Sequence, residues 1–267
     1  MPSYDDDMRL AHVLADAADA LTVRRYKAQD LLVETKPDMS PVTDADRSAE
    51  ETIRSTLKRA RPRDGVVGEE FGSTGSGWRR WIVDPIDGTK NFVRRVPVWA
   101  TLIALMEDDE VMVGLASAPM LGRRWWASRG QGAWTGRGLS SASRCQVSQV
   151  GTLGDASFSY SSLTGWEKQD RLDGLLELSR RCWRTRAYGD FWSHVLVAEG
   201  AVDCAAEPEV SLWDLAAVSL IIEEAGGKFT DLDGRPGPSG GSAVATNGRL
   251  HVEVLELLRA RQSGDGD

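Results

Sequence analysis

The segment Asp84-Pro-Ile-Asp-Gly-Thr-Lys-Asn-Phe92 places two carboxylates, a glycine and a hydroxyl directly after the apolar run Trp81 to Val83, where a strand ends and a turn begins. Proline fixes φ between the two acids and glycine lets the backbone approach a ligand closely, so both carboxylates are able to point into one pocket. Two acids beside an apolar strand cost desolvation energy unless a positive charge compensates them. Because hard cations such as Mg²⁺ prefer carboxylate oxygens, the segment predicts a metal and phosphate site.

Composition excludes several classes of protein. The chain has 267 residues, 41% of them hydrophobic and 27% charged, which is enough for a globular core in one or two domains. A net charge of -8 and a pI near 5.1 argue against a nucleic-acid-binding surface. Cys145, Cys182 and Cys204 are widely spaced and predict neither a disulfide framework nor a zinc site. An acidic start and interrupted apolar runs predict no export signal and no membrane span, so we expect a cytoplasmic protein.

Apolar periodicity predicts that two helices open the chain and that strands follow. Apolar residues repeat at helical spacing over 10–21 and again over 49–60. Short apolar runs then predict the strands of a largely antiparallel sheet, at 66–67, 81–83, 98–106, 111–118 and 124–127. We therefore expect residues 1–143 to form an N-terminal α+β half that carries most of the metal ligands.

A second, mixed α/β layer is expected after the Gly/Ser-rich stretch 130–143. Residues 156–160 have a strand pattern, a helix is expected near 171–181, and strands and helices then alternate to the end of a C-terminal half, 144–261. Segments 72–77 and 235–242 have the composition of exposed loops, and 262–267 that of a frayed tail.

Acidic residues recur at element boundaries outside the opening segment. Thr43-Asp-Ala-Asp46 and Ser211-Leu-Trp-Asp214 also match the S/T-x-x-D/E capping pattern, so a helix cap explains either acid as well as a ligand does. Glu69 and Glu70, taken alone, are explained most simply as turn residues. Only the acids at Asp84 and Asp87 are difficult to explain without a bound cation.

These segments together resemble the inositol monophosphatase-like phosphatases, in the right order and over nearly the whole chain. The resemblance implies an α+β fold, a layered αβαβα sandwich of the inositol monophosphatase and fructose-1,6-bisphosphatase type. It also implies Mg²⁺ dependence, hydrolysis of small phosphate monoesters and a homodimer. The matching motifs are Gly68-Glu-Glu70, Trp81-Ile-Val-Asp-Pro-Ile-Asp-Gly-Thr89, Trp213-Asp-Leu-Ala-Ala217 and Glu224-Ala-Gly-Gly227.

The resemblance implies metal ligands residue by residue. Glu69, Asp84 and the backbone carbonyl of Ile86 are expected to hold a first Mg²⁺, with Asp84 bridging to a second. Asp87 and Asp214 are expected to complete the second site, and a third, weaker ion near Glu69 is common in the family. Two metal ions about 3.5 to 4 Å apart neutralise the anionic ester, activate water and stabilise the leaving oxygen.

Similarity to the family also implies a catalytic set and a phosphate site. Thr89 is expected to be the partner of the attacking water, with Asp46 polarising its hydroxyl and Glu69 helping to accept the proton. The amides of Gly88 and Thr89 open an expected helix and suit phosphate oxygens. Lys36 matches a family lysine near the site, although a solvated lysine before Pro37 explains it equally well.

Substrate specificity is expected from Arg186, Asp190 and Glu207 in the second half, which face the site in the family. Inositol phosphatases tend to have a small neutral residue where this chain has Asp190, and a second acid beside Glu207 favours a substrate with a positive charge. The chain looks most like the histidinol-phosphatases of this family found in actinobacteria, whose substrate carries a protonated amine. Asp190 is equally compatible with a cap for the helix beginning at Phe191, and Arg186 with a bridge to a neighbouring carboxylate.

Other functions remain open at this point. Inositol-1-phosphate hydrolysis is the main alternative, ahead of sugar bisphosphates and phosphoadenosine nucleotides, and a metal-dependent binding or regulatory protein with little turnover is an alternative of another class. His12, His194 and His251 show no metal-ligand spacing. Trp125 and Trp126, on an expected strand, favour the core or a dimer interface over base stacking.

Overall fold

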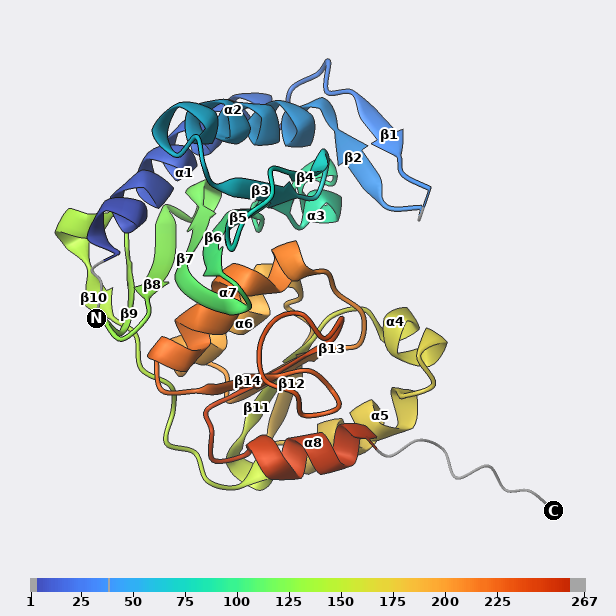
Figure 1. Ribbon diagram of the computed structural model, residues 1–267. Helices are drawn as coiled ribbons and strands as arrows, with labels where there is room; N and C mark the ends of the chain where they lie inside the picture. Colours follow the sequence, from blue (N-terminus) through green and yellow to red (C-terminus); the bar gives the residue numbers. More distant parts are fainter. Residues whose placement is uncertain (1–3, 38, 260–267) are drawn as a thin grey trace.

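The computed structural model describes residues 4–37 and 39–259, and in this part of the chain helices and sheets alternate in layers (Figure 1). The order of the layers is α, β, α, β, α, as the resemblance implied. The outer helices on the larger sheet are α1 (Asp5–Arg25) and α2 (Asp44–Ala60), the central helices are α6 (Asp190–Ala198) and α7 (Leu212–Glu224), and those on the smaller sheet are α5 (Leu172–Arg181) and α8 (His251–Arg259).

The larger sheet has eight strands and is antiparallel except for the parallel pair β3 and β5. The predicted strands are all present in it. The strands in spatial order are β10 (Ser143–Arg144), β9 (Ala133–Gly136), β8 (Arg123–Ser128), β7 (Glu110–Ala118), β6 (Ala100–Glu107), β5 (Arg79–Asp87), β3 (Gly65–Gly68) and β4 (Gly72–Thr74).

The structure differs from the sequence expectation at the edges of this sheet. β4 lies in the segment expected to be a loop, and β9 and β10 lie at the Gly/Ser-rich stretch. All side chains of β4 and β10 are exposed, so these edge strands lack the apolar alternation by which a strand is recognised. The hairpin of β1 (Val33–Thr35) and β2 (Pro41–Thr43) was missed for a similar reason, because β1 is exposed throughout.

The smaller sheet has five strands of mixed direction. β11 pairs in parallel with both β12 and β13, whereas β15 is antiparallel to β13 and β14. In spatial order its strands are β12 (Arg184–Arg186), β11 (Ser157–Tyr160), β13 (Cys204–Glu207), β15 (Ala243–Thr246) and β14 (Lys228–Thr230). Two shorter helices, α3 (Thr89–Val93) and α4 (Leu163–Lys168), lie at the ends of β5 and β11.

Helix α7 is the centre of the packing, because it lies between the two sheets and buries an unbroken run of residues, 215–222. A helix that is apolar all round is typical of such a position. Gly114 of β7 lets α7 approach: a Cβ at this glycine would lie 2.5 Å from the carbonyl oxygen of Ala217. Trp125 and Trp126 of β8 are buried within the chain, as the core interpretation requires. None of the helices in the described ranges combines the length and apolarity needed to cross a membrane.

Gly114→Ala is expected to lower the free energy of unfolding by about 1–3 kcal/mol, because the new methyl group meets backbone that has no rotamer by which to yield. Since α7 also carries Asp214, the affinity for Mg²⁺ is expected to fall with it. Chemical denaturation and magnesium titration measure both effects. Gly138→Ala is the control: Gly138 has an extended φ of 171° and no atom within 4 Å of the place that a methyl group would occupy, so this variant should match wild type.

Candidate active site

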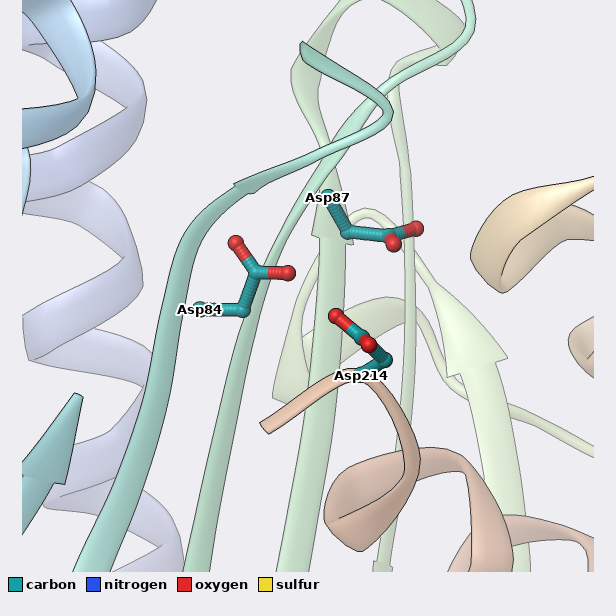
Figure 2. Close-up of side chains that lie close together, drawn as sticks. All are labelled: Asp84, Asp87 and Asp214. Carbon is teal, nitrogen blue, oxygen red and sulfur yellow. The ribbon is translucent and has the colours of Figure 1, made fainter. Parts of the chain in front are cut away.

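Three carboxylates from two distant parts of the chain meet where the larger sheet faces α7 (Figure 2). Asp84 and Asp87 come from the end of β5, and Asp214 comes from the first turn of α7. One oxygen from each lies within 4.8 Å of the others. The structure thus brings together Asp84, Asp87 and Asp214, which the family resemblance implied as metal ligands.

The local backbone holds each acid in this position. Asp84 Oδ1 accepts the Ile86 N–H at 2.9 Å, at the irregularity in β5 between Asp84 and Asp87. Asp214 Oδ2 accepts the Ser211 N–H at 2.7 Å in a capping box, so its second oxygen is left for the cluster. The cap and the ligand interpretations of Asp214 are therefore compatible.

Burial makes this cluster electrostatically costly. Asp84 is 1% exposed and Asp87 8%. Loss of solvation, followed by the neighbouring carboxylates, raises the pKa of both groups well above the usual range for aspartate. Burial also raises the pKa of Asp214 to about 7, although the Ser211 N–H opposes the shift. Buried acids that repel one another need a cation, and their hard oxygens fit Mg²⁺.

Asp87 also fixes the start of α6. Its Oδ2 accepts the Phe191 N–H at 2.6 Å, across 104 positions of sequence. Asp190 adopts a positive φ of 51° at this point, a conformation that costs energy in a residue with a Cβ. The helix N-cap is Gly189, so Asp190 does not cap the helix, and Asp87 takes the N–H that a cap would accept.

Thr89, Ile86 and Asp46 meet beside the cluster. The Thr89 hydroxyl donates to the Ile86 carbonyl at 3.0 Å and lies 3.4 Å from Asp46 Oδ1, so its bond to the carbonyl is the shorter one. Asp46 Oδ2 accepts the Thr43 N–H in the capping box of α2. Asp46 is fully buried, and this burial raises its pKa to about 7.

Glu69 lies outside the group of three but close enough to Asp84 to raise the pKa of that acid. Lys36, in the β1–β2 hairpin, donates at 2.6 Å to both Glu69 and Glu70. The turn that holds these acids is fastened by the buried Glu50, which accepts the Glu70 N–H at 2.7 Å. Gly68 is required here, because a Cβ would collide with the Glu50 carboxylate.

A cleft of about 1000 Å³ opens from the carboxylates towards the second half of the chain. Gly88, Asp190 and Glu207 line it. Gly88 has a φ of 84°, and a Cβ there would lie 3.3 Å from Asp190 Oδ2. Burial and then the Glu207 charge raise the pKa of Asp190 to about 6, so the two acids are neighbours.

Two expected substrate residues lie outside this cleft lining. Arg186 is exposed at the end of β12, and its guanidinium donates to the neighbouring Thr185 carbonyl at 2.7 Å. Lys36 forms ion pairs with Glu69 and Glu70.

The cleft also contains residues that sequence reasoning did not select. Lys90 and Asn91 follow Thr89, and Asn91 Nδ2 donates to Val98 O at 2.9 Å and lies 3.3 Å from Asp190 Oδ2. His194 lines the cleft and contacts Glu207. Its spacing of four residues from Asp190 on a predicted helix was the available signal, because i and i+4 share a helix face.

Asp84→Asn is expected to stabilise the metal-free protein by about 1–3 kcal/mol, because one buried charge is removed from a repelling group. The same change should abolish the rise in Tm that Mg²⁺ produces in wild type. Differential scanning calorimetry with EDTA or with Mg²⁺ measures both effects, and a lower metal-free Tm would contradict the repulsion argument.

The metal-free protein is also expected to lose stability as pH rises from about 5 to 8. Carboxyls with raised pKa in the folded state bind protons that the unfolded chain has already released, so folding is favoured at low pH and this contribution is lost as pH passes the folded pKa, about 7 for Asp214. Saturating Mg²⁺ should remove this slope. Urea unfolding across the pH range tests it.

Comparison with known proteins places the chain among relatives of the same length. It is 68% identical to a histidinol-phosphatase of Streptomyces coelicolor over 98% of this chain and 100% of the relative. It is 59% identical to a histidinol-phosphatase of Mycobacterium tuberculosis over 96% of this chain and 98% of the relative.

Solved structures agree with this placement. An extragenic suppressor protein SuhB from Bartonella henselae superposes with a TM-score of 0.88 at 30% identity, over 96% of this chain and 99% of that one. An inositol monophosphatase from Zymomonas mobilis gives 0.85 at 30% identity, over 97% and 100%. The sequence profile described as "Inositol monophosphatase family" matches residues 6–263. The chain therefore belongs to the inositol monophosphatase family.

Proposed function

We propose that this protein is a Mg²⁺-dependent histidinol-phosphatase, a phosphoric monoester hydrolase in which water attacks phosphorus. The observation that carries the proposal is the convergence of Asp84, Asp87 and Asp214 beside a cleft that Asp190 and Glu207 also line. Two relatives named histidinol-phosphatase, at 68% and 59% identity, support the choice of substrate.

The metal ligands are proposed from the buried acids and their neighbours. Glu69, Asp84 and the Ile86 carbonyl would hold one Mg²⁺, Asp84, Asp87 and Asp214 a second, and Glu69 would contribute to a third. Bound Mg²⁺ would supply positive charge that offsets the anionic ester and would lower the pKa of water, so that the water gives up a proton more readily and becomes a better nucleophile. The repulsion among the acids supports this assignment, because each bound cation relieves it.

The chain itself supplies orientation and a proton acceptor. Thr89 orients the attacking water through its hydroxyl, and Asp46, 3.4 Å away, positions that hydroxyl. Glu69 accepts the proton, and the Lys36 ammonium at 2.6 Å keeps the Glu69 carboxylate in place. The N–H groups of Gly88 and Thr89 face the phosphate, since the first N–H groups of a helix lack intrahelical acceptors.

Residues in the second half of the chain recognise the alcohol portion of the phosphate ester. Asp190 and Glu207 lie close together in the cleft, where burial raises the pKa of Asp190 to about 6. A protonated amine placed between them would stabilise both carboxylates, whereas a neutral hydroxyl would leave their repulsion in place. Arg186 is proposed as a further substrate contact beyond the cleft lining.

We propose that residues 1–143 carry most of the metal ligands and that residues 144–261 carry Asp214 and the specificity residues. We also propose that the protein is a cytoplasmic homodimer that acts on a small phosphorylated substrate and binds neither nucleic acid nor membrane. Sedimentation velocity tests the dimer.

Inositol-1-phosphate hydrolysis is the second candidate, favoured by the likeness to solved inositol monophosphatases. With saturating Mg²⁺, kcat/KM is expected to be at least about tenfold higher on histidinol phosphate, which corresponds to about 1.4 kcal/mol of added transition-state stabilisation. Phosphate release from both esters measures the ratio. A reversed ratio would select the inositol ester, and no release from a panel of esters would favour a non-catalytic binding protein.

Asp190→Asn is expected to raise KM for histidinol phosphate roughly tenfold, because one charge-assisted hydrogen bond to the amine is lost. Steady-state kinetics should show little change with 3-(imidazol-4-yl)propyl phosphate, the same ester without the amine. Equal effects on the two esters would refute recognition of the charge.

A further inference from the structure

His194 occupies a position in the cleft that the metal chemistry does not use. It lies four residues after Asp190 on α6, on the same helix face, and it is 1% exposed. Its Nε2 lies 3.2 Å from Oε1 of Glu207 at the end of β13. This side-chain hydrogen bond thus links a central helix to the smaller sheet inside the cleft.

The hydrogen bonds identify the state of the ring. Nδ1 of His194 is buried and has no hydrogen-bond partner in the described ranges 4–37 and 39–259. A doubly protonated ring would leave a charged N–H donor buried without an acceptor, which is the most costly arrangement. The neutral ring with its proton on Nε2 leaves only a lone pair unused. His194 therefore donates from Nε2 to Glu207.

The orientation of the Glu207 carboxylate depends on this hydrogen bond. Glu207 is 7% exposed, and the His194 contact is the one hydrogen bond made by its carboxylate within the described part of the chain. Oε2 is left without a protein partner while the residue lines the cleft. Loss of the His194 donor would free the carboxylate to rotate and to turn away from the neighbouring Asp190 charge.

We propose that His194 is a positioning residue for substrate selection: it fixes Glu207 through Oε1 so that Oε2 faces the ammonium group of the substrate. The inference rests on the proposed function, because it requires an amine-bearing ester. His194 touches Glu207 rather than the reacting phosphate, so it should act on KM for that ester and leave kcat largely unchanged.

A packing role is the competing explanation. The imidazole also lies edge-on to Phe229, with ring centroids 6.0 Å apart. Loss of packing would affect folding and all substrates alike. Loss of the Glu207 contact would affect only esters that carry the positive charge.

The test compares His194→Gln with His194→Asn. The glutamine amide nitrogen reaches the place of Nε2 and retains the donor, whereas that of asparagine stops near the place of Nδ1 and cannot reach Glu207. Each variant is assayed with Mg²⁺ on histidinol phosphate and on 3-(imidazol-4-yl)propyl phosphate. His251→Asn is the matched control, because His251 is also 1% exposed but bonds to Thr230 and Thr246 outside the cleft lining.

For His194→Asn we expect KM for histidinol phosphate to rise about tenfold with kcat within about twofold, the size of one hydrogen bond to a charged group. His194→Gln should stay within about threefold of wild type, and neither variant should change KM for the ester without the amine. His251→Asn should lower Tm and leave the ratio of the two KM values unchanged.

An equal rise in KM for both esters, no rise in His194→Asn, or a failure of His194→Gln to retain a low KM would each overturn the positioning role. The proposed function is tested separately by wild type alone. If wild type hydrolyses both esters equally well, amine recognition is refuted before any variant is made, and the role of His194 falls with it.

Discussion

The mutual repulsion of Asp84, Asp87 and Asp214 is the constraint on which the rest of the structure depends. One oxygen from each lies within 4.8 Å of the others, in surroundings that raise the pKa of all three. In the unfolded chain these groups would be solvated, and Asp214 would lie far from Asp84 and Asp87, so the fold must hold the three together against their own charge. Helix α7 is buried between the two sheets and packs closely on β7 at Gly114. This close packing makes the frame rigid enough to hold the acids together.

The metal side and the substrate side of the cleft are parts of one hydrogen-bonded unit. Asp87 accepts the Phe191 N–H, and the positive φ of Asp190 orients that N–H. Asn91 lies between Val98 and Asp190, and His194 joins α6 to Glu207. A proposed metal ligand therefore also sets the start of α6, the helix that carries Asp190 and His194. A substitution that alters specificity must leave the start of this helix in place, because the position of Asp87 depends on it.

Hydrogen bonds and ion pairs near the site also hold its acidic residues in position, as the packing of the core does. Glu50, fully buried, holds the Glu69–Glu70 turn and is itself paired with Arg54 at 2.7 Å. Lys36 supplies the positive charge nearest to these acids in the described structure, at 2.6 Å. Asp84, Asp87 and Asp214 each accept a backbone N–H, and Glu69 pairs with Lys36. A buried carboxylate without any partner would destabilise the fold or take up a proton.

The sequence by itself determined the long helices, the central strands and the acids at their ends, because apolar periodicity and turn chemistry are local properties that α1, α2 and β5 express strongly. It did not reveal β1, β4 or β10, whose exposed side chains have no apolar pattern. Only the tertiary structure decided that Asp87 caps α6, that His194 contacts Glu207, and that Lys36 pairs with Glu69. These contacts join residues brought together by layer packing, and nothing in local sequence encodes a distance between elements.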